Sequence, residues 1–295
     1  MYERYYGLRE RPFDLTPNPR YLFLSAKHRE ALSHLHYGIC GRKGITVLIG
    51  EAGTGKTTLV HTALEQQRDE KTCAVYLSNP LLARSEFFEF LAWGYGLDAT
   101  AETSKTRFVL ELTRTLMARQ EAGGTAALVI DEAQCLSYEL MEEIRLLANI
   151  ETATDKLLPV VLVGQPELAD RLNEPSLRQL KQRVALRCAL PALDSGETAA
   201  YISNRVTVAG GKSDQLFTPE AIDTIFEHSR GIPRTVSVIC DNALLSGFAA
   251  DERPVSRDTV LEVCRDFDLS PVGTPAATAL ASAGATAAPR TSSFF

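Results

Sequence analysis

The stretch GEAGTGKT, residues 50 to 57, constrains the fold of this chain more than any other feature. It matches the spacing G-x-x-x-x-G-K-[ST], and it stands between an apolar β-branched run at 45–50 and a helical pattern at 57–67. This context predicts a tight strand-to-helix turn whose glycines let backbone N–H groups point at phosphate oxygens. A glycine-rich turn without a ligand is the weaker interpretation, because both flanks are right for a phosphate site.

We expect one continuous segment to bind the phosphates of a nucleotide. It consists of Gly50, Glu51, Ala52, Gly53, Thr54, Gly55, Lys56, Thr57 and Thr58. Lys56 would reach the β- and γ-phosphates as a point charge, and the helix that follows adds its positive N-terminal end. The hydroxyl of Thr57 is a candidate ligand for Mg²⁺. The predicted cofactors are therefore ATP and Mg²⁺.

Short apolar runs separated by longer helical patterns recur along the first two thirds of the chain. Besides 45–50, they lie at 73–78, 126–131, 158–164 and 184–190. Buried strands that alternate with helices predict an α/β fold in which a mostly parallel sheet has helices on both faces. The expected class is thus a P-loop NTPase core.

After Pro191 the strand pattern stops and only helical patterns follow, at 194–210, 218–230, 233–249 and 256–267. They predict a second, all-helical part of the chain. We therefore expect a nucleotide-binding core with its N-terminal leader over 1–192, an all-helical C-terminal lid subdomain over 193–268, and a disordered tail rich in Ala, Thr and Pro over 269–295.

Polar side chains follow the predicted strands at the edge where the phosphate segment lies. Asp131 and Glu132 end one apolar run, and buried acids are costly unless a cation faces them. Asp131 would contact Mg²⁺ through bound water, and Glu132 would orient or deprotonate the attacking water. Gln165 and Asn79 end two other runs; either could hold the water or the γ-phosphate, or be a turn-forming amide.

A phosphate-binding core followed by a helical lid resembles the AAA+ ATPases. In that family an arginine at the start of a lid helix touches the γ-phosphate, and Arg234 in the stretch GIPR matches it. Pro233 is tolerated at the first helical position, and Gly231 lets the chain bend without a Cβ clash. A surface arginine after a helix-starting turn is the alternative.

The same resemblance implies an arginine supplied by a neighbouring subunit. The stretch PSLRQLKQRVAL at 175–186 contains Arg183, the first candidate, and Arg178, the second. With the family's geometry neither completes the site of its own chain, which implies a homo-oligomer, a ring or an arc. A basic helix face with local salt bridges is the alternative.

The leader narrows the resemblance to the ExeA/GspA-type branch of bacterial AAA+ ATPases. Its Tyr–Gly–Leu, Pro–Phe and Thr–Pro–x–Pro elements lie within residues 1–39, and GEAGTGKTTL, VIDEAQ, VGQPEL, LKQRV and GIPR continue the match to about residue 268. The branch energises assembly of cell-envelope secretion, pilus and protein-sorting systems, which implies partner proteins of that kind. Phe13 and Leu15 would line the base pocket or serve as plain hydrophobic anchors.

Charge and hydropathy limit the other functions. The net charge of −6 excludes a general coating of nucleic acid but permits a local basic groove. A DNA-associated regulator of transposition is the alternative function and would use Arg178, Lys181, Arg183 and Arg187; a non-hydrolysing scaffold is a third, which Glu132 argues against. The N-terminus is charged, and the longest apolar run, 157–163, is too short to cross a bilayer. We therefore expect a cytoplasmic protein without an integral membrane span, at most peripheral at the inner membrane. Because the span and peptidoglycan-binding domain of secretion members are missing, we expect a stand-alone ATPase.

Overall fold

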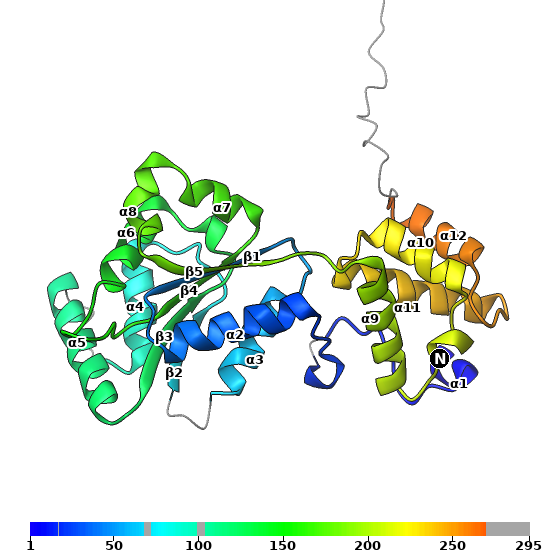
Figure 1. The fold of residues 1–295 in the computed structure, drawn as a ribbon, viewed down its shortest axis with the longest axis horizontal. Coiled ribbons are helices and arrows are strands. Elements are labelled where there is room, and N and C mark those ends of the chain that lie inside the picture. The colour runs from blue at the N-terminus through cyan, green and yellow to red at the C-terminus, as the bar shows by residue number, and fades with distance from the viewer. Residues whose placement is uncertain (17, 68–71, 99–103, 270–295) are drawn as a thin grey trace, which may run out of the picture.

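The computed structural model places an α/β body beside a bundle of helices (Figure 1). It describes residues 1–16, 18–67, 72–98 and 104–269, so the predicted tail lies outside the described residues except for Leu269. Among the described residues, no helix has both the length and the hydrophobicity that crossing a bilayer would require.

The described residues contain a five-stranded sheet in the order β2-β3-β4-β1-β5, and every neighbouring pair is parallel. Its strands are β1 Ile45–Gly50, β2 Thr72–Leu77, β3 Thr125–Ile130, β4 Val160–Gly164 and β5 Val184–Leu190. Because all strands run the same way, the segments after β1, β3 and β4 meet at one edge of the sheet. The sheet therefore brings together the polar residues that the sequence placed at separate strand ends.

Helices cover both faces of the sheet, as the alternating pattern predicts. Helices α2 and α3 pack on one face through side chains such as Leu35 and Leu59. Helices α4, α5 and α6 pack on the other face through Phe87, Leu112 and Ile144. The bounds are α2 Ala26–Cys40, α3 Lys56–Glu65, α4 Arg84–Tyr95, α5 Lys105–Glu121, α6 Tyr138–Leu147, α7 Pro166–Leu172 and α8 Arg178–Lys181.

The prediction that every strand is buried is wrong for the two outer strands of the sheet, β2 and β5. β1 is buried along its whole length and β4 likewise, but residues alternate between exposed and covered positions in β5. In β2 most residues are only half-buried. Each edge strand has a neighbour on one side only, so the covering helices do not enclose it completely.

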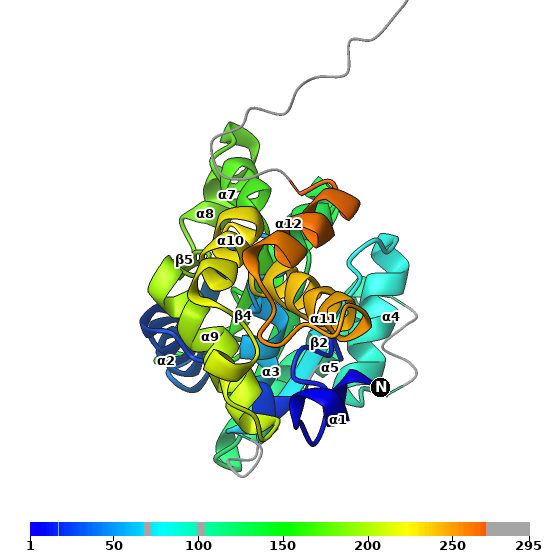
Figure 2. The same cartoon turned by 90° about the vertical axis from the view of Figure 1, so that its right-hand side faces the viewer.

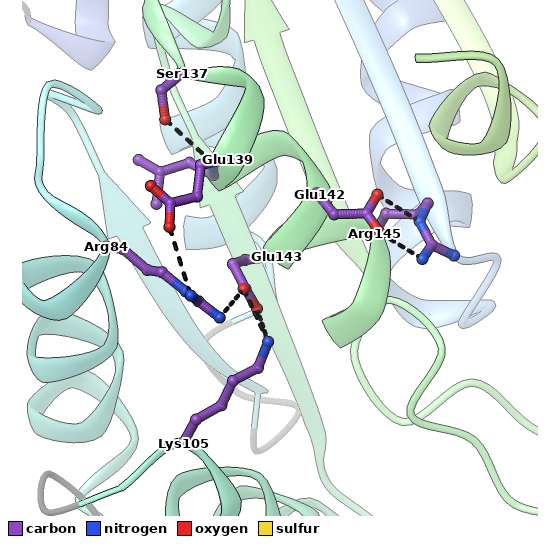
Figure 3. Close-up of polar contacts among 8 residues, drawn as sticks. Arg84, Lys105, Ser137, Glu139, Glu142, Glu143 and Arg145 are labelled. Atoms are coloured by element: carbon purple, nitrogen blue, oxygen red, sulfur yellow. Dashed lines mark hydrogen bonds and ion pairs between the residues drawn. The ribbon is translucent and has the colours of Figure 1, made fainter. Parts of the chain in front are cut away.

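An ion cluster joins three helices on one face of the sheet (Figure 3). Glu143 of α6 is buried, and its carboxylate contacts Arg84 at the start of α4, 2.5 Å from Oε1, and Lys105 at the start of α5, 2.7 Å from Oε2. Glu139, one turn earlier on α6, also faces Arg84 at 3.5 Å. The cluster ties α4 and α5 to the helix that follows the acidic loop at 131–132.

The helical patterns after Pro191 form a bundle with a hydrophobic core of its own. Its helices are α9 Ser195–Val208, α10 Pro219–Ser229, α11 Pro233–Ala249 and α12 Arg257–Asp266. They agree with the predicted ranges within two residues, and the Thr218 side chain caps α10 by accepting from Ala221 N.

The N-terminal leader packs on this bundle, although the sequence grouped it with the α/β core. Helix α1 (Tyr2–Tyr6) lies against α11 (Figure 2), and the side chains of Leu8 and Phe13 are buried in the bundle core. Arg205 of α9 fixes the leader by donating to the carbonyl oxygens of Pro12 and Asp14. The leader thus connects the bundle to α2, where the α/β body begins.

Candidate functional site

A pocket of about 430 Å³ lies where the α/β body meets the bundle. One wall is the segment 52–58, the predicted phosphate-binding loop. The opposite wall comes from the leader and from α9 and α11, including Leu15, Tyr21, Tyr201, Arg205 and Arg234. The seam between the two bodies is therefore also the place where a ligand can be enclosed.

The segment 50–57, here called the cradle, curls around the Lys56 ammonium. Gly53 and Gly55 have φ of 83° and 94°, a left-handed backbone that glycine adopts without a Cβ penalty. Lys56 is buried, and its Nζ donates to the carbonyl oxygens of Gly50 at 2.8 Å and Glu51 at 3.0 Å. Burial lowers the pKa of Lys56, and the charges of Glu132 and Asp131 oppose that shift. A buried cation held by carbonyl oxygens suits an incoming anion such as a phosphate.

His28 of α2 supports the cradle and lines the pocket beside it, a role the sequence did not reveal. Its Nε2 lies 3.2 Å from the carbonyl oxygen of Thr54, and its Nδ1 lies 2.9 Å from Ser25 Oγ at the start of α2. Burial lowers the pKa of His28, which favours the neutral ring. Ser25 also caps α2, because its side chain accepts from the His28 N–H.

Thr57 and Asp131, the two predicted metal ligands, are in contact. Thr57 Oγ1 donates to Asp131 Oδ2 at 2.7 Å, and the Tyr76 hydroxyl donates to the same oxygen at 2.7 Å. Burial, followed by the contact with Asp131, raises the pKa of Tyr76, so its hydroxyl stays protonated. A hydroxyl beside a carboxylate is an oxygen-donor set of the kind that Mg²⁺ prefers next to phosphates, so these residues fit the ion.

Glu132 is held in place by two glutamine side chains. The amide nitrogen of Gln165 lies 3.2 Å from Glu132 Oε2, and Gln134 Nε2 donates to the same oxygen. Gln134 Oε1 in turn accepts from the backbone N–H of Gln165 at 3.1 Å. Glu132 itself has a left-handed backbone with φ of 49°, which is uncommon outside glycine and typical of functional sites.

Gln134 is thus a functional-site residue that sequence reasoning missed, although its motif VIDEAQ was part of the resemblance. The Gln134 side chain has room at the end of β4 because residue 164 is glycine. A Cβ on Gly164 would lie 2.8 Å from Gln134 Oε1. The signal in the sequence was the glycine that ends the apolar run before Gln165. That signal has no meaning until β3 and β4 are known to be neighbours.

The GIPR turn brings Arg234 to the cradle. A Cβ on Gly231 would lie 1.9 Å from the Leu193 carbonyl oxygen, so only glycine fits at this position, where φ is 69°. Pro233 is the first residue of α11, and the N–H of Arg234 donates to Gly53 O at 3.2 Å. Arg234 lines the pocket, as Lys56 does, and makes no salt bridge within the described part of the chain.

Other predicted residues lie elsewhere. Asn79 is exposed and its side-chain oxygen accepts from Leu81 N at 3.2 Å, which is the turn-forming alternative named above. Arg183 and Arg178 are exposed and do not line the pocket. Leu15 lines it, whereas Phe13 is a hydrophobic anchor, the other alternative named for it, because it packs edge-on against Phe217 inside the bundle.

Comparison with known proteins agrees with this geometry. Residues 40–172 match the family described as an AAA domain. The chain is 42% identical over 250 residues to the general secretion pathway protein A of Aeromonas hydrophila, which covers 84% of this chain and 45% of the relative. The chain therefore spans less than half the length of this relative.

Solved structures support the fold at low sequence identity. The Aeropyrum pernix ORC2 protein is similar with a TM-score of 0.64 and 16% identity, covering 87% of this chain and 71% of its own. A Walker-type ATPase of Pyrococcus abyssi is similar with a TM-score of 0.60 and 17% identity, covering 87% and 76%. The resemblance drawn from the sequence is therefore confirmed: the chain contains an AAA domain with a P-loop ATPase fold and is a relative of general secretion pathway protein A.

Proposed function

We propose that this protein binds ATP at the seam between its two bodies and hydrolyses it in the presence of Mg²⁺. The observation that carries the proposal is the convergence of Lys56, the Thr57–Asp131 pair and Glu132 around the cradle, where Arg234 of the bundle also lines the pocket. A P-loop site needs these charges, because phosphoryl transfer depends almost entirely on positioning and charge stabilisation.

Each residue has a distinct task in this proposal. Bound Mg²⁺–ATP would supply a phosphoanhydride whose γ-phosphate is polarised by the metal. The cradle N–H groups and Lys56 bind the phosphate oxygens, and Thr57 with Asp131 would hold the ion. Glu132 orients a water and accepts its proton on the carboxylate, while Gln165 keeps that carboxylate in place. Arg234 binds the outermost phosphate from the bundle side and so links phosphate loss to the position of the bundle.

We further propose that hydrolysis energises or regulates assembly of a cell-envelope secretion, pilus or sorting system. The identity to general secretion pathway protein A supports this role, and a cytoplasmic, homo-oligomeric ATPase with envelope-assembly partners is the form we propose for it. In this form the segment 1–192 holds the nucleotide-binding core and the leader that packs on the bundle, and 193–268 is the lid.

Nucleotide affinity of a Lys56→Ala variant tests the ATP site. We expect the loss of the ammonium to weaken binding of a fluorescent ATP analogue about 100-fold, because Lys56 is the buried cation that contacts the β- and γ-phosphate oxygens. Lys27→Ala is the matched control, since Lys27 is exposed and pairs with Glu30 on the surface of α2. Near-normal affinity of Lys56→Ala would refute the cradle assignment.

Additions to the ATPase assay separate the proposed biological roles. Envelope membranes carrying secretion-system proteins are expected to raise turnover, whereas duplex DNA is expected to leave it unchanged. Stimulation by DNA that falls steeply with salt would instead support the DNA-associated regulator.

A further inference from the structure

Tyr76 contacts the predicted metal ligand Asp131 but has no task in the proposed hydrolysis. Its hydroxyl reaches Asp131 Oδ2 from β2, while Thr57 reaches the same oxygen from α3. The other oxygen, Oδ1, accepts from the backbone N–H of Glu132 at 2.9 Å. Three donors from three parts of the chain therefore determine how this carboxylate is turned.

The ring of Tyr76 is held in place from two sides. In the sheet register Tyr76 lies beside Val129, two residues before Asp131, so its hydroxyl extends past the end of β3. Its ring packs against the ring of His61, which lies one turn beyond Thr57 on α3. The two ring centroids are 4.7 Å apart. Tyr76 thus lies between the two elements that carry Thr57 and Asp131.

We propose that Tyr76 is a positioning residue for Mg²⁺, acting through Asp131. This inference rests on the proposed function, because it concerns the metal of the same site. A carboxylate without fixed partners rotates about its own bonds, and binding an ion then costs the free energy of ordering it. A neutral hydroxyl orients the carboxylate without cancelling the negative charge that attracts the cation. Outer partners of metal ligands typically contribute 10- to 100-fold in metal affinity.

The test is a Mg²⁺ titration that needs no turnover. The protein is mixed with a fluorescent, non-hydrolysable ATP analogue, and fluorescence is followed as MgCl₂ is added. We expect Tyr76→Phe to raise the half-saturating Mg²⁺ concentration about tenfold, and to leave the affinity for the analogue in EDTA unchanged.

Tyr95→Phe is the matched control. Tyr95 also donates a buried hydroxyl to strand β3, but to the Ala127 carbonyl at 2.8 Å, four residues before Asp131. We expect it to leave the Mg²⁺ midpoint unchanged. Circular dichroism and the melting temperature of both variants check that each is folded.

The outcomes are distinguishable. A Mg²⁺ midpoint of Tyr76→Phe within twofold of the wild type overturns the inference, as does an equal shift in Tyr95→Phe. Equal weakening with and without Mg²⁺ also overturns it, because the tyrosine would then support the cradle rather than the ion. Failure of the wild-type protein to bind the analogue at all refutes the proposed function itself.

Discussion

At the scale of single residues, Glu132 combines an unusual backbone with a restrained side chain. Its left-handed conformation costs about 1–3 kcal/mol in a non-glycine residue. The strain is tolerated because its neighbours are fixed: the Asp131 N–H donates to Leu77 O at the end of β2, and Gln134 Oε1 accepts from the Gln165 N–H after β4. Gln134 and Gln165 also hold the Glu132 carboxylate. The loop is therefore built around the position of one carboxylate.

Replacing this carboxylate by an amide should separate binding from turnover. We expect Glu132→Gln to lower kcat about 10²- to 10⁴-fold, because the amide cannot take the proton of the attacking water, while ATP still binds. Retention of ATP after gel filtration and the rate of phosphate release measure the two effects. Glu89→Gln, the same change at an exposed position of α4, should match the wild type. Rapid turnover by Glu132→Gln would contradict the water-activating role of Glu132.

At the scale of elements, the ion cluster of α4, α5 and α6 has unequal members (Figure 3). The Glu143 side chain is 5% exposed, whereas those of Arg84 and Lys105 are 42% and 41% exposed. The cations can turn to water when the carboxylate is removed, but the carboxylate cannot when the cations are removed. The cost of a substitution therefore depends on which side of the cluster is changed.

This asymmetry gives a stability prediction. We expect Arg84→Met with Lys105→Met to lower the free energy of unfolding by about 3–5 kcal/mol, because a buried carboxylate loses its partners. Glu143→Gln should cost about 1 kcal/mol, the value of an ordinary hydrogen bond. Urea denaturation followed by circular dichroism measures both.

The neighbouring pair Glu142–Arg145 on α6 is the control for this prediction. Its members are three residues apart on one helix, and Glu142 is 54% exposed. Glu142→Gln should therefore change stability by no more than about 0.5 kcal/mol. Equal losses for Glu143→Gln and for the double variant would show that the buried carboxylate does not depend on its cations.

At the scale of the whole molecule, Arg183 lies near the start of strand β1 and the pocket lies at its end. The Arg183 carbonyl accepts from Ile45 N at the first residue of β1, whereas the cradle begins at Gly50, its last. The five steps from Ile45 to Gly50 rise about 17 Å at about 3.3 Å each, beyond the reach of an arginine side chain. Arg183 can thus complete a nucleotide site only in another copy of the chain.

Mixing two inactive variants tests this arrangement. Arg183→Ala keeps an intact cradle, and Lys56→Ala keeps an intact Arg183, so mixed oligomers would contain some complete sites. We expect the mixture to regain part of the ATPase activity that neither variant has alone. Arg178→Ala, treated in the same way, shows which arginine acts. The absence of rescue with either arginine would contradict action between subunits.

The sequence by itself determined the features that depend on local spacing. The cradle, the strand positions, the helices of the bundle and the turn before Arg234 follow from glycines, β-branched runs and caps a few residues apart. Only the tertiary structure decided which distant groups touch. Gln134 belongs to the site because β3 lies beside β4, and Tyr76 because β2 lies beside β3. His28 belongs to it because α2 contacts the cradle, and the leader packs on the bundle. The physical reason is that backbone conformation is decided over a few residues, whereas a hydrogen bond between side chains requires two strands or helices to be placed side by side.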